Sequence, residues 1–296
     1  LTLLRRHLAR HATAILTEPG DPAGWLHGRA HEVVLTLGRT PAEHPKPSPR
    51  VTRASTTAHR PGMSQWLYAK LYGRSDDILH QVPALGDAYS RASWFIRYHA
   101  PVPHLRLRLA LRDETEFACT ARRLAVWADQ LRDAGVLAGY SLGTYQPEPR
   151  FGTGPTLAAA EAVFAADSRA VLSHLHADPV VRTAAGIITI TDGFADNGLT
   201  WLLDHVDHRG HGSADRVAQH RDTVIDTARH RDTALQTALA RYRTLAEADS
   251  LNVDRVLADL LHLHHARSIG PDLASERYCL RLARTAAKTM LMRQAS

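Results

Sequence analysis

Cysteine and lysine are scarce in this chain of 296 residues, and it contains no long apolar run. Cys119 and Cys279 are the two cysteines; they lie far apart and outside any CxxC pattern, so the sequence predicts no disulfide framework. No stretch reaches the roughly eighteen apolar residues that a membrane span requires. The first residues also lack the charged and then apolar layout of a signal peptide. These absences predict a cytoplasmic protein that has no membrane partner.

The positive charge of the chain comes almost entirely from arginine. The formal net charge is +6, and the 36 Lys and Arg residues include only three lysines, Lys46, Lys70 and Lys288. Arginines are interspersed with acidic residues and form no continuous basic stripe, which argues against a nucleic-acid partner and suits an acidic peptide. Hydrophobic residues make up 44% of the chain and charged residues 22%, which predicts a folded globular protein.

The first 62 residues differ in pattern from the rest. Residues 1–16 have apolar positions at helical spacing, residues 32–37 are typical of a strand, and residues 41–49 are rich in proline. We therefore expect an N-terminal extension over residues 1–62 and a separate domain over residues 63–296.

Residues 63–155 combine helical and alternating patterns. The sequence predicts a helix over 65–79, a hairpin of two strands over 92–99 and 104–111, a helix over 116–134 and a strand over 140–145. Together these elements predict an α+β fold in which helices back a small antiparallel sheet.

The C-terminal half is predicted to be largely helical. Helices are expected over 157–176, 213–248, 253–267 and 273–292. The β-branched run at 187–190 fits either a strand or a segment of a buried helix, and the pattern alone leaves both open.

The second hairpin strand has two arginines on one face. Arg106 and Arg108 alternate with leucines, so strand geometry separates the arginines from the leucines. His104 shares the polar face, and Arg97 lies in the preceding strand. Guanidinium groups on a rigid strand suit the binding of carboxylates or amide oxygens. The alternative is a solvated sheet face with surface salt bridges.

A second polar cluster follows the last predicted strand. Tyr145, Glu148 and Arg150 place a phenol, a carboxylate and a guanidinium within six residues, ahead of a turn rich in glycine. These groups could transfer protons or orient a peptide amide. The alternative is a turn in which Glu148 and Arg150 pair with each other.

Histidines gather near the end of the helix predicted over 253–267. His262 and His265 share a face at helical spacing, whereas His264 points elsewhere, and Arg267 follows them. A zinc site needs three or four ligands at definite spacings, and no further ligand completes one here. We therefore predict no metal and no cofactor.

Six segments in this order resemble the C-terminal domain family of lantibiotic dehydratases and its free-standing relatives in thiopeptide biosynthesis. The resemblance covers about residues 63–293. It is carried by Trp66-Leu-Tyr-Ala-Lys-Leu-Tyr72, Trp94-Phe-Ile-Arg-Tyr98, His104-Leu-Arg-Leu-Arg108, Thr144-Tyr-Gln-Pro-Glu148, Glu161-Ala-Val-Phe-Ala-Ala-Asp-Ser168 and His262-Leu-His-His-Ala-Arg267.

The resemblance implies chemistry on dehydroalanine. Some members of the family eliminate glutamate from glutamylated Ser or Thr in a ribosomal peptide. Others, the pyridine synthases, join two dehydroalanines in a formal aza-[4+2] cycloaddition, which closes a macrocycle with loss of water and the leader peptide. The glutamylating region is absent from this sequence, so we expect a step downstream of glutamylation.

Two departures from the family pattern favour the pyridine synthase. Eliminating members usually have Arg-Tyr-Gly-Gly after the Tyr-x-Pro-Glu element and Asn before the last arginine of the histidine-rich motif. This chain has Arg150-Phe-Gly-Thr-Gly154 and Ala266. The N-terminal extension could supply additional peptide-binding surface, which fits the cyclising branch. Glutamate elimination and a non-catalytic peptide-binding role remain the alternatives.

The resemblance also assigns roles to the clustered residues. Tyr145, His104, His262 and Glu148 are the expected catalytic residues. The expected substrate-binding residues are the arginines Arg97, Arg106, Arg108, Arg150 and Arg267. The expected partner is a ribosomally made precursor peptide with a leader and a dehydrated, azole-containing core, together with other enzymes of the pathway.

Overall fold

The computed structural model describes residues 58–90, 92–207, 214–230 and 232–294. These residues all belong to one compact unit, which spans 54–296. The helix, strand and proline-rich segment expected before residue 58 lie outside the described residues.

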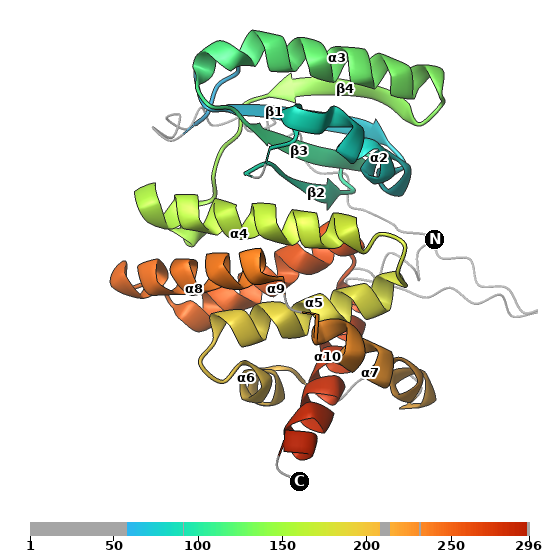
Figure 1. The fold of residues 1–296 in the computed structure, drawn as a ribbon, viewed down its shortest axis with the longest axis vertical. Coiled ribbons are helices and arrows are strands. Elements are labelled where there is room, and N and C mark those ends of the chain that lie inside the picture. The colour runs from blue at the N-terminus through green and yellow to red at the C-terminus, as the bar shows by residue number, and fades with distance from the viewer. Residues whose placement is uncertain (1–57, 91, 208–213, 231, 295–296) are drawn as a thin grey trace, which may run out of the picture. The chain divides into compact units, whose positions relative to one another are not determined.

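Four strands form an antiparallel sheet in the order β2-β3-β1-β4 (Figure 1). The strands are β1 (Trp66–Gly73), β2 (Trp94–Tyr98), β3 (His104–Ala110) and β4 (Leu137–Gly143). Helix α2 (Ser75–Gln81) and the 3-10 segment Val82–Ala88 connect β1 to β2, and α3 (Phe117–Asp133) connects β3 to β4. This is the split βαβ topology of ferredoxin-like folds. The predicted hairpin, antiparallel sheet and α+β class are confirmed.

The helix predicted over 65–79 is wrong, because the structure places strand β1 and the short helix α2 there. Leu67, Ala69 and Leu71 pack on one side of the sheet, while Trp66 and Tyr68 pack on the other. Since both faces of β1 are buried, its sequence lacks the apolar and polar alternation of a half-exposed strand. The resulting run, apolar except for Lys70, was interpreted as a helical pattern.

The two faces of the sheet enter different cores. One face carries leucines such as Leu105 and Leu107 and packs against Leu124 and Trp127 of α3. The opposite face carries Tyr68 and Trp94, which belong to the core of the helical half. Arg108 pairs with Tyr68 on one side and with Trp94 on the other. The predicted separation of arginines from leucines on β3 is therefore confirmed.

The remainder of the described chain is helical, as predicted. Its helices are α4 (Gly154–Ser173), α5 (Pro179–Phe194), α6 (Gly198–His205), α7 (Ala214–Ala228), α8 (Thr233–Ala248), α9 (Val253–Ser268) and α10 (Leu273–Gln294). The segment 187–190, for which the sequence allowed either a strand or a buried helix, lies inside α5. The prediction of a single helix over 213–248 was wrong, because α7 ends at Ala228. Asp232 caps a new helix, α8, by accepting hydrogen bonds from the backbone N–H groups of Ala234 and Leu235.

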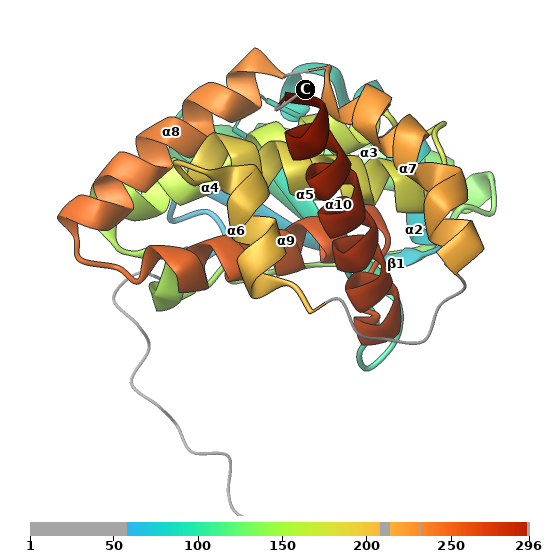
Figure 2. The ribbon, with the colours of Figure 1, turned by 90° about the horizontal axis from the view of Figure 1, so that it is seen from below.

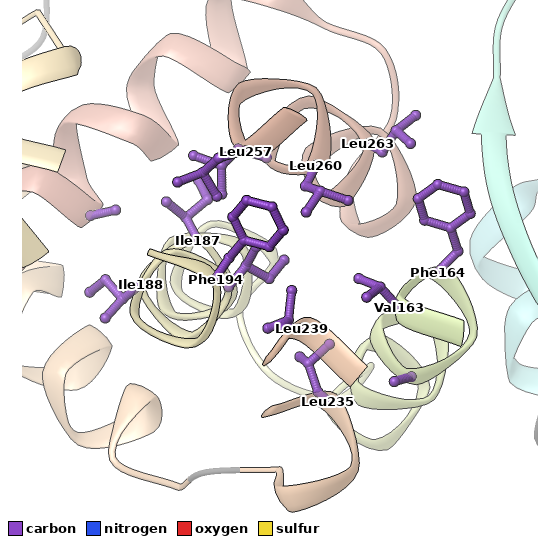
Figure 3. Close-up of a cluster of buried hydrophobic side chains, with 14 of the residues drawn as sticks. Val163, Phe164, Ile187, Ile188, Phe194, Leu235, Leu239, Leu257, Leu260 and Leu263 are labelled. Carbon is purple, nitrogen blue, oxygen red and sulfur yellow. The ribbon is translucent and has the colours of Figure 1, made fainter. Parts of the chain in front are cut away.

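Apolar side chains from four helices hold this half together. Figure 3 shows Val163 and Phe164 of α4 facing Leu260 and Leu263 of α9, with side chains of α5 and α8 completing the cluster. Helix α10 runs across α5, α6 and α7 (Figure 2). The result is a fixed pair of helices, α4 and α9, that contacts strand β2.

Strand β2 is fastened to both of these helices through the backbone of Phe95. The Phe95 N–H donates to Ser168 Oγ of α4 at 3.2 Å, and the Phe95 carbonyl accepts from Arg267 Nε of α9 at 3.0 Å. These bonds fix the spacing between the sheet and the helices, and a cavity lies there.

Candidate functional site

A cavity of about 170 Å³ lies between the arginine-bearing face of the sheet and the helices α4 and α9. Most of the predicted site residues line it. They are Arg97, Arg106, Arg108, Tyr145, Glu148, Arg150 and His262. The structure thus brings together residues from β2, β3, the segment after β4, and α9.

Arg108 is held in this wall by aromatic rings rather than by an acid. Its guanidinium carbon lies 3.9 Å from the ring centre of Trp94, 4.9 Å from that of Tyr68 and 5.0 Å from that of Tyr145. The residue is 8% exposed, and among the described residues it forms no ion pair. Burial lowers the pKa of Arg108 to about 10. The side chain is therefore a buried cation, the kind of group that usually has an anionic or acceptor partner.

Buried donors without a hydrogen-bond partner gather at the same cavity. They are Nε1 of Trp94, Nη2 of Arg97, and Nε and Nη1 of Arg108. An unsatisfied buried donor costs about 1–3 kcal/mol, so nearby orphaned donors indicate that a ligand completes them. Carboxylate and amide oxygens have the required acceptor character.

Arg106 lies at the same wall and is oriented by His104. Its guanidinium stacks on Tyr98 at 3.4 Å from the ring centre, and its Nε donates to His104 Nε2 at 3.2 Å. His104 Nδ1 is 2.8 Å from the carbonyl of Val102, so Nδ1 carries the proton and Nε2 accepts. Burial lowers the pKa of His104, which favours this neutral form. His104 lies beside the cavity, and this geometry favours a positioning role for it.

Tyr145 joins the cavity to the carboxylate of Glu161, to which the sequence analysis assigned no role. Its hydroxyl donates to Oε1 of Glu161 at 2.6 Å, and its ring packs edge-on against Trp66 and Trp94. Burial and the neighbouring Glu161 raise the pKa of Tyr145, so the free group remains a phenol. Burial also raises the pKa of Glu161.

A sequence signal for Glu161 existed. It is an acid within the otherwise apolar run of α4, and Leu157, Phe164 and Ala165 lie three or four residues away. An acid in such a run is expected to lie on the buried face of the helix and to need a hydrogen-bond partner there. The helical spacing alone is enough to identify such an acid.

An exposed ion-pair cluster borders the cavity. Arg150 Nη2 is 2.8 Å from Glu148 Oε2, and Arg150 Nη1 is 2.7 Å from Asp259 Oδ1 of α9. The pairing of Glu148 with Arg150 that the sequence allowed is present, and both residues also line the cavity. Glu148 is exposed, so its carboxylate stays hydrated while it lines the cavity.

The histidines of α9 point in two directions, as predicted. His262 Nδ1 lies 2.9 Å from Glu276 Oε2, and His265 Nε2 lies 3.0 Å from Ser275 Oγ, so both face α10. His264 faces α4 instead, where its Nδ1 is 2.7 Å from Asp167 Oδ1. His262 lines the cavity, and its hydrogen bond to Glu276 raises its pKa. It is the cavity histidine best able to exchange a proton near neutral pH.

Arg267 lies outside the cavity and is fully buried. Its Nη1 pairs with Asp167, its Nε donates to Phe95, and its carbonyl accepts from Arg97 Nε at 2.9 Å. Burial alone would raise the pKa of Asp167, but His264 and Arg267 lower it overall. Arg267 thus ties α9 to α4 and β2, and the geometry favours a structural role for a residue that was expected to bind substrate.

Neither a metal cluster nor a membrane span is found in the part of the chain that the structure describes. It contains no group of three or more His, Cys, Asp or Glu side chains that could hold a metal ion. In those same residues, no helix is long and apolar enough to cross a membrane.

Residues 66–287 match a protein-family model described as lantibiotic biosynthesis dehydratase C-term. The subtilin biosynthesis protein SpaB of Bacillus subtilis is 27% identical in an alignment of 152 positions that covers 47% of this chain and 15% of SpaB.

Two solved structures share the fold. The tRNA dependent lantibiotic dehydratase MibB from Microbispora sp. 107891 aligns with a TM-score of 0.67 at 24% identity, over 78% of this chain and 29% of MibB. The pyridine synthase TbtD from thiomuracin biosynthesis aligns with a TM-score of 0.54 at 16% identity, over 76% of this chain and 98% of TbtD. The chain therefore spans less than a third of the length of SpaB and of MibB.

Proposed function

Because this chain belongs to the lantibiotic biosynthesis dehydratase C-terminal family, we propose that it is a pyridine synthase. Its substrate would be a leader-bearing ribosomal peptide with two dehydroalanines and an azole-containing core. Formal aza-[4+2] cycloaddition would close the macrocycle, and water and the leader peptide would then leave.

The observation that carries this proposal is the position of the two departures from the eliminating pattern. Phe151 and Ala266 stand where eliminating members usually have Tyr and Asn, and both line the cavity. Phe151 is 2% exposed and packs against Phe164 at 5.1 Å between ring centres. The polar groups that accompany elimination are thus replaced by apolar ones at the cavity wall itself.

The remaining polar groups suit the first step of a cycloaddition. An amide beside one dehydroalanine must lose its N–H proton and gain negative charge on oxygen to become a 2-azadiene. The orphaned donors of Arg108 can stabilise that oxygen, and Tyr145 with Glu161 can take the proton. Holding two distant dehydroalanines together supplies much of the remaining barrier reduction.

Glutamate elimination is the second candidate, and a different observation favours it. Among the described residues, neither Arg106 nor Arg108 has a carboxylate partner, so the pair could bind the glutamyl carboxylate. His262, with its raised pKa, would then exchange the α-proton of the glutamylated residue. The same cavity would serve both reactions with different roles for its residues.

Mass spectrometry separates the candidates. The protein would be incubated, without tRNA or ATP, with a leader-bearing thiazole peptide that contains two dehydroalanines, and separately with its glutamyl-serine counterpart. A macrocycle together with free leader peptide supports the proposal. If only the second peptide reacts, by losing glutamate, the protein is an eliminating enzyme and not a pyridine synthase. Binding of both peptides without turnover would indicate a non-catalytic partner.

A further inference from the structure

Tyr145 separates the cavity from Glu161. Tyr145 lines the cavity, whereas Glu161 does not. The hydroxyl proton of Tyr145 lies in a 2.6 Å hydrogen bond to Glu161 Oε1, so it points away from any bound ligand. A ligand that contacts this hydroxyl therefore meets the free lone pairs of its oxygen.

A buried phenol in this geometry has one way to take up a proton. It can accept at its oxygen only if its own proton leaves at the same time, because its raised pKa prevents a free phenolate and a doubly protonated phenol is not accessible. Glu161 is the acceptor within reach. We infer that Glu161 is the proton store of this site and that Tyr145 relays protons between Glu161 and the bound peptide.

This inference rests on the proposed function for the identity of the proton, which is the amide N–H beside a dehydroalanine. In the forward step the N–H bond breaks, its proton joins Tyr145 Oη, and the phenolic proton moves to Glu161 Oε1. Tyr145 is unchanged, Glu161 becomes a neutral acid, and the amide becomes an imidate whose oxygen is bound by Arg108. After ring closure the reverse relay returns the stored proton to this oxygen, which becomes a hydroxyl, and Glu161 is again a carboxylate. The hydroxyl then leaves as water with a hydrogen from the neighbouring ring carbon, so the C–O and C–H bonds break and a ring double bond forms.

The surroundings of Glu161 favour storage of one proton. Among the described residues it forms no ion pair, and its carboxylate is mostly buried. Burial raises the pKa of Glu161, while Tyr145 and Arg108 lower it to a smaller extent. Three other groups face the relay through Tyr145: Arg108, the exposed Glu148, and His59, which stacks on the Tyr145 ring at 5.4 Å. Burial lowers the pKa of His59, so it adds no positive charge near neutral pH.

The pH dependence of kcat tests the relay. In the wild type, kcat should rise with pH as Glu161 loses its proton and becomes able to accept one. Glu161→Gln keeps the size of the side chain but cannot store a proton, so we expect kcat to fall about 100-fold, KM to change little and the acidic limb to disappear. Tyr145→Phe should give the same loss, and the double variant should be no slower than either single one.

Two further variants keep the result interpretable. Glu114→Gln, an equivalent change on the surface, should keep the wild-type profile. Glu161→Asp retains an acid, so it should keep an acidic limb at reduced kcat and covers the case in which Glu161→Gln does not fold. Retention of the acidic limb in folded Glu161→Gln, or an effect on KM alone, would overturn the relay.

Infrared titration tests the same pair without any turnover. A protonated carboxyl band should be lost in Glu161→Gln and should titrate at higher pH in Tyr145→Phe, because the hydrogen bond from Tyr145 lowers the pKa of Glu161. If the carboxyl band titrates at the same pH in Tyr145→Phe as in the wild type, the two side chains are not coupled. If the wild type converts neither peptide, the proposed function fails, and this titration still decides whether the two side chains share a proton.

Discussion

Under the proposed function, Arg108 binds a ligand at a cost to the stability of the fold. It is buried among three aromatic rings, and two of its nitrogens have no hydrogen-bond partner. Desolvating a cation costs several kcal/mol. Stacking on aromatic rings returns about 2 kcal/mol. The difference is a stability cost that a bound acceptor removes.

Replacing this cation should therefore raise stability and abolish function. Arg108→Met should unfold at a urea midpoint equal to or above that of the wild type, while turnover falls at least 100-fold on loss of the charge that stabilises the developing oxyanion. The matched control is Arg267→Met, which strands Asp167 without its partner and should lose about 3–5 kcal/mol. A clear loss of stability in Arg108→Met would show that the aromatic stacking outweighs desolvation.

His262 gives a residue-scale prediction for pH. Its pKa is raised above 6.5, chiefly by the hydrogen bond to Glu276. A raised pKa in the folded state means that the pair stabilises the fold fully below pH 6.5 and that this contribution fades as pH rises through the folded pKa. Glu276→Gln should lower the pKa of His262 in an NMR titration. An unchanged pKa would assign the shift to other neighbours.

At the scale of elements, the contact between α5 and α9 depends on one small residue. A Cβ added at Gly186 would overlap the Nε2 end of the His264 ring, and Asp167 holds that ring from the other side. Gly186→Ala should therefore lower the free energy of unfolding by about 1–3 kcal/mol through overpacking, as measured in urea. Gly139→Ala is the matched control, since nothing lies within 4 Å of its Cβ position. Equal stability of the two variants would contradict the packing argument.

Sequence patterns identified elements whose local pattern agrees with their surroundings. The alternation of Arg106 and Arg108 with leucines predicted β3 and its two faces, because each face meets a different environment. A repeated tetrapeptide shows the limit of local patterns. His-Arg-Asp-Thr occurs at 220–223 and again at 230–233, yet Asp222 lies inside α7, whereas Asp232 caps α8. The same residue type in the same sequence context thus lies within one helix and caps another, so tertiary context decides between the two positions.

The candidate site was predictable where its residues lie close in sequence or alternate on a strand. Arg108 and Tyr145 were found in this way. Glu161 lies 16 residues from its partner Tyr145, and Asp167 lies 97 residues from His264 and 100 from Arg267. Such pairs form only after the helices have packed on the sheet. The sequence could therefore mark Glu161 as an acid in an apolar run but could not identify its partner, and it assigned Arg267 to substrate.

For the described molecule as a whole, aromatic rings join the sheet to the helical half. Trp94 of β2 packs on Phe164 of α4 at 5.1 Å between ring centres, and Phe164 packs on Phe151 at the same distance. Since the joint is buried and continuous with the helical core, both halves should unfold together.

Phe164→Ala tests whether the sheet and the helical half unfold together. The substitution should lower the free energy of unfolding by about 3–5 kcal/mol, with circular dichroism and tryptophan fluorescence still reporting one shared urea transition. Separate transitions for the two signals would mean that the sheet and the helices fold independently. The conservative control Phe164→Leu should lose much less.

The attachment of Phe95 to α4 and α9 also opposes self-association through the edge strand β2. An unpaired edge strand presents free N–H and C=O groups to which a foreign strand can add, and this is a common start of aggregation. In β2 the N–H of Phe95 is bound by Ser168 and its carbonyl by Arg267. A strand from another molecule could pair there only if both helices were displaced. The contacts that shape the cavity therefore also block strand addition at this edge of the sheet.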